Sequence, residues 1–296
     1  MTAWTETACA KLNLSLDVTG RRADGYHLLS MVCQTVTLSD TLAFERRRGG
    51  LRVTCPGAQG IPDGPENLVY RAAEAFFRET GETDQNVTII VTKRIPSQAG
   101  LGGGRAAAAP PRRGLCRRYR RPRSFLRRRA RARGIGGAVP VLIQGGTALA
   151  EGIGERLTPL PEMPACTIVL CKPQVGISTA EAYRKIDAAE AMPGARYTPG
   201  VLRALESGNL DALSTSLGNR FADVLHVPEV DALQKGLLAA GALGACMTGS
   251  GSAVFGLFRE EAVARRAAAQ LAQNGTQTFV CKAAGTTVPG RNVPSI

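Results

Sequence analysis

The chain has 296 residues, of which 44% are hydrophobic and 21% are charged, as in an ordinary globular protein. It contains no apolar run of about 18 residues, and its start lacks a basic segment followed by an apolar one, so we expect a soluble cytoplasmic protein without a membrane partner. With 2 histidines and 8 scattered cysteines that form no C-x-x-C pair, we expect reduced thiols and no metal bound by side chains.

The formal charge of +13 arises in one arginine-rich segment. Between residues 105 and 133 the chain has 13 arginines and no acidic residue. Outside that segment, basic and acidic residues balance. The basic character is therefore local and does not describe the general surface.

In the first half of the chain, hydrophobic patterns predict a sheet with interspersed helices. Apolar and β-branched runs bounded by Gly, Pro and Asp predict strands, and apolar residues at helical spacing predict a helix. The predicted strands are residues 8–18, 31–44, 51–55, 87–93, 139–143 and 147–150, with strand-like sequence continuing to about 160, and the predicted helix is 66–80.

The second half reads as a separate unit. Two prolines and a charged residue at 161–164 predict a boundary between an N-terminal domain, 1–162, and a C-terminal domain, 163–296. The predicted order beyond it is strand 166–172, helices 178–191, 201–206 and 230–240, strand 253–258, helix 260–273 and strand 278–282. This alternation indicates an α/β or α+β fold, and the residues after about 285 resemble a loose tail.

The strongest chemical pattern follows the strand predicted at 87–93. Residues 96–104 read Pro-Ser-Gln-Ala-Gly-Leu-Gly-Gly-Gly, with four glycines in five positions. Without side chains, the backbone can approach a phosphate closely and turn its N–H groups inward. The loop lacks the G-K-[ST] ending of a Walker loop and the G-x-G-x-x-G spacing of a dinucleotide fold. Taken alone, a glycine turn without a ligand explains it equally well.

Two further motifs accompany this loop. Residues 8–14 read Ala-Cys-Ala-Lys-Leu-Asn-Leu, and residues 247–253 read Met-Thr-Gly-Ser-Gly-Ser-Ala. In this order the three motifs resemble the signature of the GHMP kinases. Within them, the Gly-Arg-Arg-Ala-Asp-Gly-Tyr-His of residues 20–27, together with residues 144–155 and 172–179, resembles the 4-diphosphocytidyl-2-C-methyl-D-erythritol kinase family.

The resemblance implies an α/β (α+β), two-domain GHMP kinase fold, with an N-terminal ribosomal-protein-S5-domain-2-like domain and a C-terminal ferredoxin-like α+β domain. It implies a kinase that uses ATP and Mg²⁺ to phosphorylate the 2-hydroxyl of a small alcohol bearing a cytidine diphosphate group, in the non-mevalonate route to isoprenoid precursors. A monomer or homodimer without a nucleic-acid partner is expected.

The resemblance also implies roles for individual residues. For ATP it implies Asn67, Pro96, Ser97, Gln98, Ala99, Gly100, Leu101, Gly102, Gly103, Gly104, Arg105 and Ala106. For the substrate it implies Asn13, Tyr26, His27, Tyr183, Gly249, Ser250 and Gly251, with Tyr26 and His27 at the cytosine ring. Lys11 would stabilise the transferring phosphoryl group, because a lysine among apolar neighbours needs an anionic partner. Structural alternatives stay open: a surface lysine at 11, a satisfied amide at 13, a helix cap at 67 and a core aromatic at 183.

The family pattern breaks in the arginine-rich segment. After the glycines the family continues S-x-D-A-A, where this chain has Arg-Ala-Ala-Ala-Ala-Pro-Pro at 105–111. We expect Pro110 and Pro111 to disrupt the helix that follows, because a proline costs roughly 3 kcal/mol in a helix interior. The family's catalytic aspartate, the general base, is replaced by Ala138.

Three interpretations of the segment remain open. It is a nucleic-acid-binding arm, a solvated insertion, or a translation in the wrong reading frame, since GC-rich DNA read out of frame yields Arg, Ala, Pro and Gly. We favour the third as a hypothesis, because the segment replaces family motifs without visibly lengthening the chain. If the gene sequence is confirmed as given, we expect the chain to fold poorly and to transfer phosphate very slowly, because the helix packing and the general base are missing. The alternative functions are another GHMP small-alcohol kinase, or an inactive kinase scaffold with a nucleic-acid-binding segment.

Overall fold

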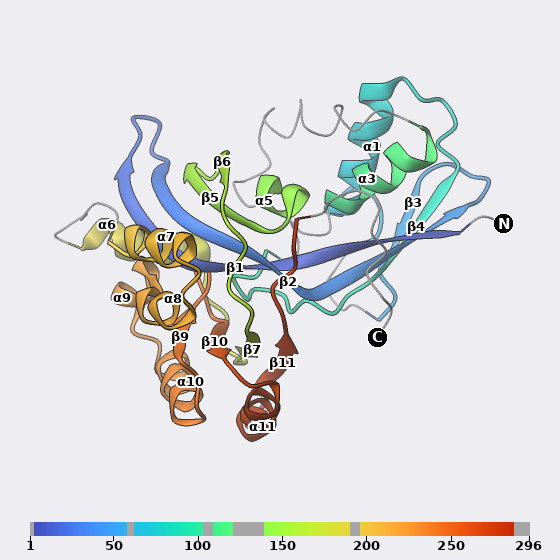
Figure 1. Ribbon diagram of the computed structural model, residues 1–296. Helices are drawn as coiled ribbons and strands as arrows, with labels where there is room; N and C mark the ends of the chain where they lie inside the picture. The colour runs from blue at the N-terminus through green and yellow to red at the C-terminus, as the bar shows by residue number, and fades with distance from the viewer. Residues whose placement is uncertain (1–2, 58–61, 103–108, 121–138, 190–195, 287–296) are drawn as a thin grey trace.

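The computed structural model describes residues 3–57, 62–102, 109–120, 139–189 and 196–286. These residues form two sheets flanked by helices (Figure 1). The larger sheet has the strand order β3-β4-β2-β1-β8, and β5 extends it by pairing with β2 and β6. Its strands are β1 (Trp4–Arg21), β2 (His27–Arg46), β3 (Arg52–Thr54), β4 (Val87–Thr92), β5 (Thr147–Gly152), β6 (Arg156–Pro159) and β8 (Gly218–Asn219).

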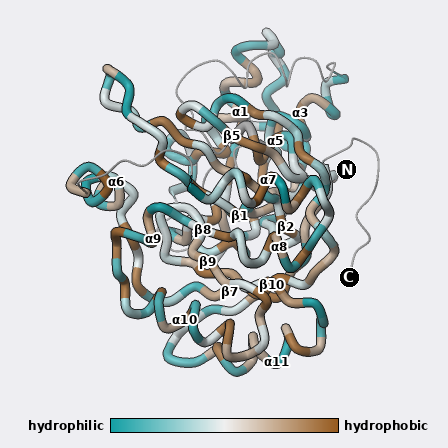
Figure 2. The backbone as a smooth tube through the Cα atoms, turned by 60° about the vertical axis from the view of Figure 1, so that its left-hand side comes forward, coloured by the Kyte–Doolittle hydropathy of each residue, from teal (hydrophilic) through white to brown (hydrophobic). Residues whose placement is uncertain are grey.

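The smaller sheet belongs to the second half of the chain and has the order β11-β7-β10-β9. Its strands are β7 (Thr167–Lys172), β9 (Gly244–Met247), β10 (Val254–Phe258) and β11 (Gln277–Cys281). Helices α10 (Pro228–Ala239) and α11 (Glu261–Leu271) lie against this sheet at the bottom of Figure 1. Both alternate between hydrophilic and hydrophobic stretches along the tube in Figure 2, as expected of helices with one buried face.

The remaining helices cover the larger sheet and the junction between the two sheets. They are α1 (Leu68–Thr80), α3 (Ala109–Arg118), α5 (Val139–Gln144), α6 (Thr179–Ala188), α7 (Thr198–Glu206), α8 (Leu210–Ser216) and α9 (Arg220–Leu225). Within the described ranges, no helix is long and apolar enough to cross a membrane. All eight cysteines are free thiols, as expected.

The long hairpin of β1 and β2 connects the two halves of the chain. The two strands pair antiparallel from Trp4 opposite Phe44 to Arg21 opposite His27. Near its middle, β1 also pairs in parallel with β8, which comes from the second half of the chain. Residues 10–17 are all buried, because other elements cover both faces of β1 there. Side chains on this part of β1 are therefore held at the junction of the halves.

Most predicted elements are confirmed, with boundary shifts of a few residues. The strand predicted at 139–143 is wrong, since Val139–Gln144 is the helix α5. A short apolar run has no period that separates a buried helix from a strand. The short elements α8, α9, β8 and β9 were not predicted, because none exceeds seven residues. The predicted domain boundary falls between β6 and β7 and remains a prediction.

Pro110 and Pro111 do not prevent a helix beyond them, but the predicted disruption directly after the glycines falls on residues 103–108, which lie outside the described residues. The helix α3 begins at Ala109, so both prolines lie in its first turn, where a missing N–H group costs nothing. Leu115 and Cys116 are buried in the hydrophobic core beside α1. The part of the arginine-rich segment that the structure describes is therefore packed into the fold, unlike a solvated insertion. Residues 121–138 lie outside the described part of the chain.

Candidate active site

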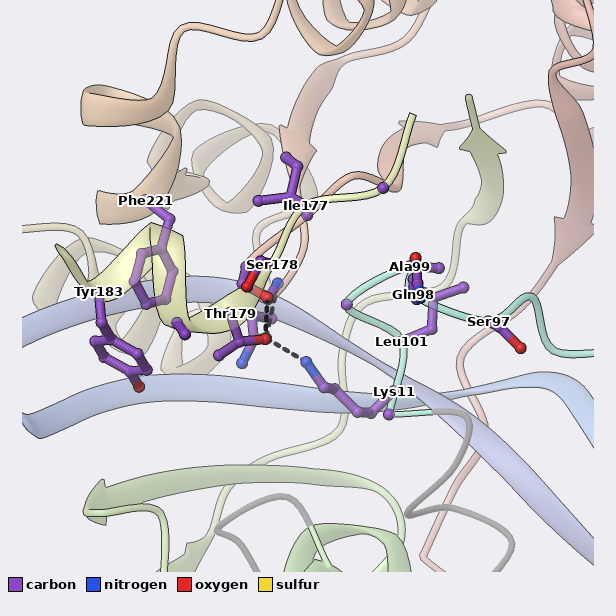
Figure 3. A pocket seen from close by; sticks show the side chains of 18 of the residues that line it. Lys11, Ser97, Gln98, Ala99, Leu101, Ile177, Ser178, Thr179, Tyr183 and Phe221 are labelled. Atoms are coloured by element: carbon purple, nitrogen blue, oxygen red, sulfur yellow. Dashed lines mark hydrogen bonds between the residues drawn. The ribbon is translucent and has the colours of Figure 1, made fainter. Parts of the chain in front are cut away.

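A cleft of about 1320 Å³ lies between the two halves of the chain. It is lined by β1, β2, the start of α6 and two loops (Figure 3). One is the glycine-rich loop, whose residues 96–102 line the cleft, and the other is the loop after β9, which contributes residues 249–251. The predicted site residues that line it are Lys11, Asn13, Tyr26, His27, Asn67, Pro96, Ser97, Gln98, Ala99, Gly100, Leu101, Gly102, Tyr183, Gly249, Ser250 and Gly251. Gly103, Gly104, Arg105, Ala106 and Ala138 lie outside the described residues.

The glycine-rich loop and the loop after β9 touch backbone to backbone. A Cβ atom on Gly100 would lie 2.0 Å from the carbonyl oxygen of Thr248, and one on Gly249 would lie 2.7 Å from the carbonyl oxygen of Gly100. Both glycines have positive φ, +71° and +60°. Only glycine combines that conformation with so close an approach. The two motifs, 149 residues apart in sequence, therefore form one wall of the cleft.

A buried carboxylate fixes the entry to the glycine-rich loop. Asp40 on β2 is fully buried, and its Oδ1 accepts hydrogen bonds from the backbone N–H groups of Arg94 and Ile95 at 2.8 and 2.9 Å. Its Oδ2 forms an ion pair with Lys93. The chain is thus held just before Pro96, so the loop begins from a defined position.

Lys11 lies beneath the glycine-rich loop. Its backbone N–H donates to the carbonyl of Leu101 at 3.1 Å, and its side chain passes Gly102. Lys11 is only 7% exposed, which excludes the surface lysine that the sequence left open. Its ammonium group donates to Oδ1 of Asn13 at 2.5 Å, and in Figure 3 the side chain points across the cleft toward Thr179. A buried positive charge is therefore placed beside the loop.

Asn13 has a structural role at this point. Its Oδ1 also accepts from the backbone N–H of Gly249 at 3.1 Å, and its amide nitrogen lies 3.3 Å from the sulfur atoms of Met31 and Cys33. Burial raises the pKa of the Cys33 thiol to about 11, so it remains protonated. Asn13 thus joins Lys11 to the loop after β9. Its contact with substrate stays a prediction.

Asn219, which sequence reasoning missed, holds the other side of the same loop. Its amide nitrogen donates to the carbonyls of Met247 and Gly249, both at 2.8 Å. Ser250 adds a hydroxyl contact to Thr179 at 2.9 Å, which ties the loop to the start of α6. No sequence motif around Asn219 indicates this contact, because its hydrogen-bond partners are about 30 residues away.

At the opposite end of the cleft, aromatic side chains gather around the β1–β2 turn. Tyr26 is 62% exposed, and His27 is almost buried. The His27 ring stacks on Tyr183 with centroids 4.5 Å apart, and Tyr183 meets Phe221 edge-on at 5.0 Å. Tyr183 therefore packs against His27 in this structure, while also lining the cleft. The exposed ring of Tyr26 remains available to stack on a planar ligand.

Asn67 serves as the N-cap of α1. Its Oδ1 accepts from the backbone N–H of Val69 at 2.8 Å, and its amide nitrogen donates to the carbonyl of Pro62 at 2.8 Å. The helix-cap alternative is thus present in the structure. Asn67 also lines the cleft, so its predicted place near the nucleotide stays a prediction.

Comparison with known proteins assigns the chain to a family. Residues 67–138 match the GHMP kinases N terminal domain, and residues 201–277 match GHMP kinases C terminal. The 4-diphosphocytidyl-2-C-methyl-D-erythritol kinase of Desulfitobacterium hafniense is 41% identical over 265 residues, covering 88% of this chain and 89% of that protein. The chain belongs to this family. The kinase of the same name from Moorella thermoacetica is 40% identical over 294 residues, covering 95% of this chain and 99% of its own.

Solved structures agree with this assignment. A crystal structure of 4-(cytidine 5'-diphospho)-2C-methyl-D-erythritol kinase superposes with a TM-score of 0.79 at 32% identity, over 95% of this chain and 100% of the other. A homoserine kinase from Cytophaga hutchinsonii, 17% identical with a TM-score of 0.71, shows the shared fold alone. The predicted two-domain GHMP kinase fold is confirmed, and membership of a kinase family implies ATP as the phosphate donor.

Proposed function

We propose that this chain transfers the terminal phosphoryl group of ATP to the 2-hydroxyl of 4-diphosphocytidyl-2-C-methyl-D-erythritol, in the non-mevalonate route to isoprenoid precursors. The observation that carries the proposal is the cleft in which Lys11, the glycine-rich loop and the loop after β9 meet at one end and His27 and Tyr183 at the other. A cleft with a phosphate site at one end and a site for a cytosine ring at the other matches a substrate that carries both a hydroxyl group and a nucleotide.

The transfer is a single in-line displacement. The substrate oxygen attacks the γ-phosphorus, the bond between γ-phosphorus and the bridging oxygen breaks, ADP leaves, and the hydroxyl proton is released. Negative charge on the γ-phosphoryl oxygens is stabilised by the buried ammonium of Lys11. Backbone N–H groups of the glycine-rich loop bind the other phosphates, because glycines let the backbone approach them.

A protein site for Mg²⁺ does not emerge from the described residues. They contain no group of three His, Cys, Asp or Glu side chains that could hold a metal. Two carboxylates line the cleft in the described part of the chain, Glu66 and Asp187, and Asp187 already pairs with His27 and Arg21. In the proposal Mg²⁺ would enter the cleft with ATP, where it would neutralise charge on the phosphates.

Replacing Ala138 with aspartate tests whether a missing base limits the rate. The family's aspartate would accept the hydroxyl proton, and a positioned base contributes typically 10²–10⁴-fold. We expect the natural chain to transfer phosphate slowly and Ala138→Asp to raise kcat at least about tenfold, with KM little changed.

Phosphate transfer from [γ-³²P]ATP to the cytidine-bearing alcohol measures this rate, and simple alcohols serve as alternative acceptors. Ala138→Asn is the matched control, since it adds a polar side chain that cannot accept the proton as a carboxylate does. A faster reaction with a simple alcohol would favour another GHMP kinase. Activity of the natural chain equal to that of a relative with the aspartate would contradict the assigned role of position 138.

A further inference from the structure

Helix α6 holds the His27 imidazole from two directions. Nε2 of His27 lies 2.7 Å from Oδ1 of Asp187, and the ring stacks on Tyr183 with an interplanar angle of 18°. Tyr183 and Asp187 are four residues apart on α6, so they project from the same face of the helix. Phe221 packs edge-on against Tyr183 from behind. The imidazole plane and its position in the cleft are therefore fixed.

Asp187 also joins α6 to the β1–β2 turn. Its second oxygen, Oδ2, lies 3.5 Å from Nη1 of Arg21. Arg21 in turn donates from Nε to the carbonyl of Gly25 at 3.1 Å, just before Tyr26 and His27. The carboxylate is thus held between the helix and the turn, with one oxygen committed to His27 and the other to Arg21.

This contact decides which nitrogen of His27 carries the proton. A carboxylate only accepts hydrogen bonds, so the neutral imidazole places its hydrogen on Nε2 and a lone pair on Nδ1. In the described ranges the structure gives Nδ1 no hydrogen-bond partner, and His27 lines the cleft. The cleft therefore contains an oriented acceptor at Nδ1.

We propose that Asp187 is a positioning residue that makes this site selective for cytosine over uracil. Cytosine has an amino group at ring position 4, where uracil has a carbonyl oxygen. A lone pair on Nδ1 accepts a hydrogen bond from the amino group and repels the carbonyl oxygen. Without Asp187, the imidazole would move its proton to either nitrogen and accommodate both bases. This inference deepens the proposed function and rests on its assignment of His27 to the base.

The test uses the full chain labelled with ¹⁵N at histidine and two simple probes, cytidine 5'-monophosphate and uridine 5'-monophosphate. Only two histidines are present, so a His226→Gln variant assigns both signals. At about pH 8 we expect the His27 spectrum to show the Nε2–H tautomer, and the cytidine probe to perturb Nδ1 and bind at least about tenfold more tightly than the uridine probe.

Asp187→Asn is expected to reduce that preference to less than about threefold and to give a mixture of tautomers. Asp187→Glu, which keeps a carboxylate, should recover most of the preference. Asp211→Asn is the matched control, because Asp211 pairs with Arg259 at 2.6 Å and does not line the cleft. It should bind both probes as the natural chain does.

Three results would overturn the inference. The first is an Nδ1–H tautomer of His27 in the natural chain. This measurement does not depend on the folding of any variant. The second is an unchanged cytidine preference in folded Asp187→Asn, which would leave the proposed function intact. The third is equal binding of both probes by the natural chain. If that is joined by faster phosphorylation of an alcohol that lacks a base, the proposed function fails as well.

Discussion

Replacing Lys11 with methionine is expected to lower kcat by about 10²–10³-fold, the cost of losing one preorganised group that stabilises transition-state charge. Methionine fills a similar volume without the charge, so the buried wall of the cleft is kept. Lys11 lies beside the glycine-rich loop and not at the predicted cytosine site. We therefore expect KM for the alcohol to change less than about threefold.

The measurement is steady-state phosphate transfer, in the natural chain and in the Ala138→Asp background, where turnover is easier to detect. Lys11→Arg keeps the charge but carries a wider planar group, and we expect it to recover little activity. Lys235→Met is the matched control, because Lys235 is exposed on α10 and absent from the cleft. A Lys11→Met variant that retains full kcat would remove Lys11 from the mechanism.

Gly100→Ala is expected to separate the two loops that form the wall of the cleft. Its Cβ would lie 2.0 Å from the carbonyl oxygen of Thr248, and backbone cannot yield as a flexible side chain would. We expect a loss of about 1–3 kcal/mol in stability from overpacking, and a reduction in ATP affinity of at least about tenfold as the loop moves.

Gly208→Ala provides the control for this variant. Gly208 has nearly the same backbone conformation, φ +62° against +71°, but a Cβ there would meet nothing within 4 Å. It carries the conformational strain without the collision, so the difference between the two variants isolates the contact between loops. Chemical denaturation and ATP titration measure both effects. Equal behaviour of Gly100→Ala and Gly208→Ala would contradict the packed arrangement of the two loops.

The motifs of this site could be read from the sequence because each is local. Glycines at 100 and 249 indicate backbone conformations that other residues rarely adopt. A lysine at 11 between apolar neighbours indicates a buried charge. The residues that hold these motifs in place could not be found in that way. Asp40, Asn219 and Asp187 contact partners far away in sequence, and an isolated Asp or Asn has no pattern of its own.

The same distinction explains where the predicted elements differ from the observed ones. Long elements such as β1 and α1 have enough residues to show a period, whereas Val139–Gln144 is too short to separate helix from strand. The cost expected of Pro110 and Pro111 applies to prolines in a helix interior. At the first turn of α3 they favour its start. Position along the element, which the sequence did not define, reverses the effect.

The most direct test of the nucleotide site is a titration of the folded chain with MgATP, followed by ¹H–¹⁵N NMR of the backbone amides. We expect saturable binding with the largest shifts at Gly100, Leu101 and Gly102, and loss of those shifts in Gly100→Ala. Folded protein that shows no saturable shift at these amides, or shifts confined to residues outside the cleft, would contradict the assignment of the glycine-rich loop to the phosphates of ATP.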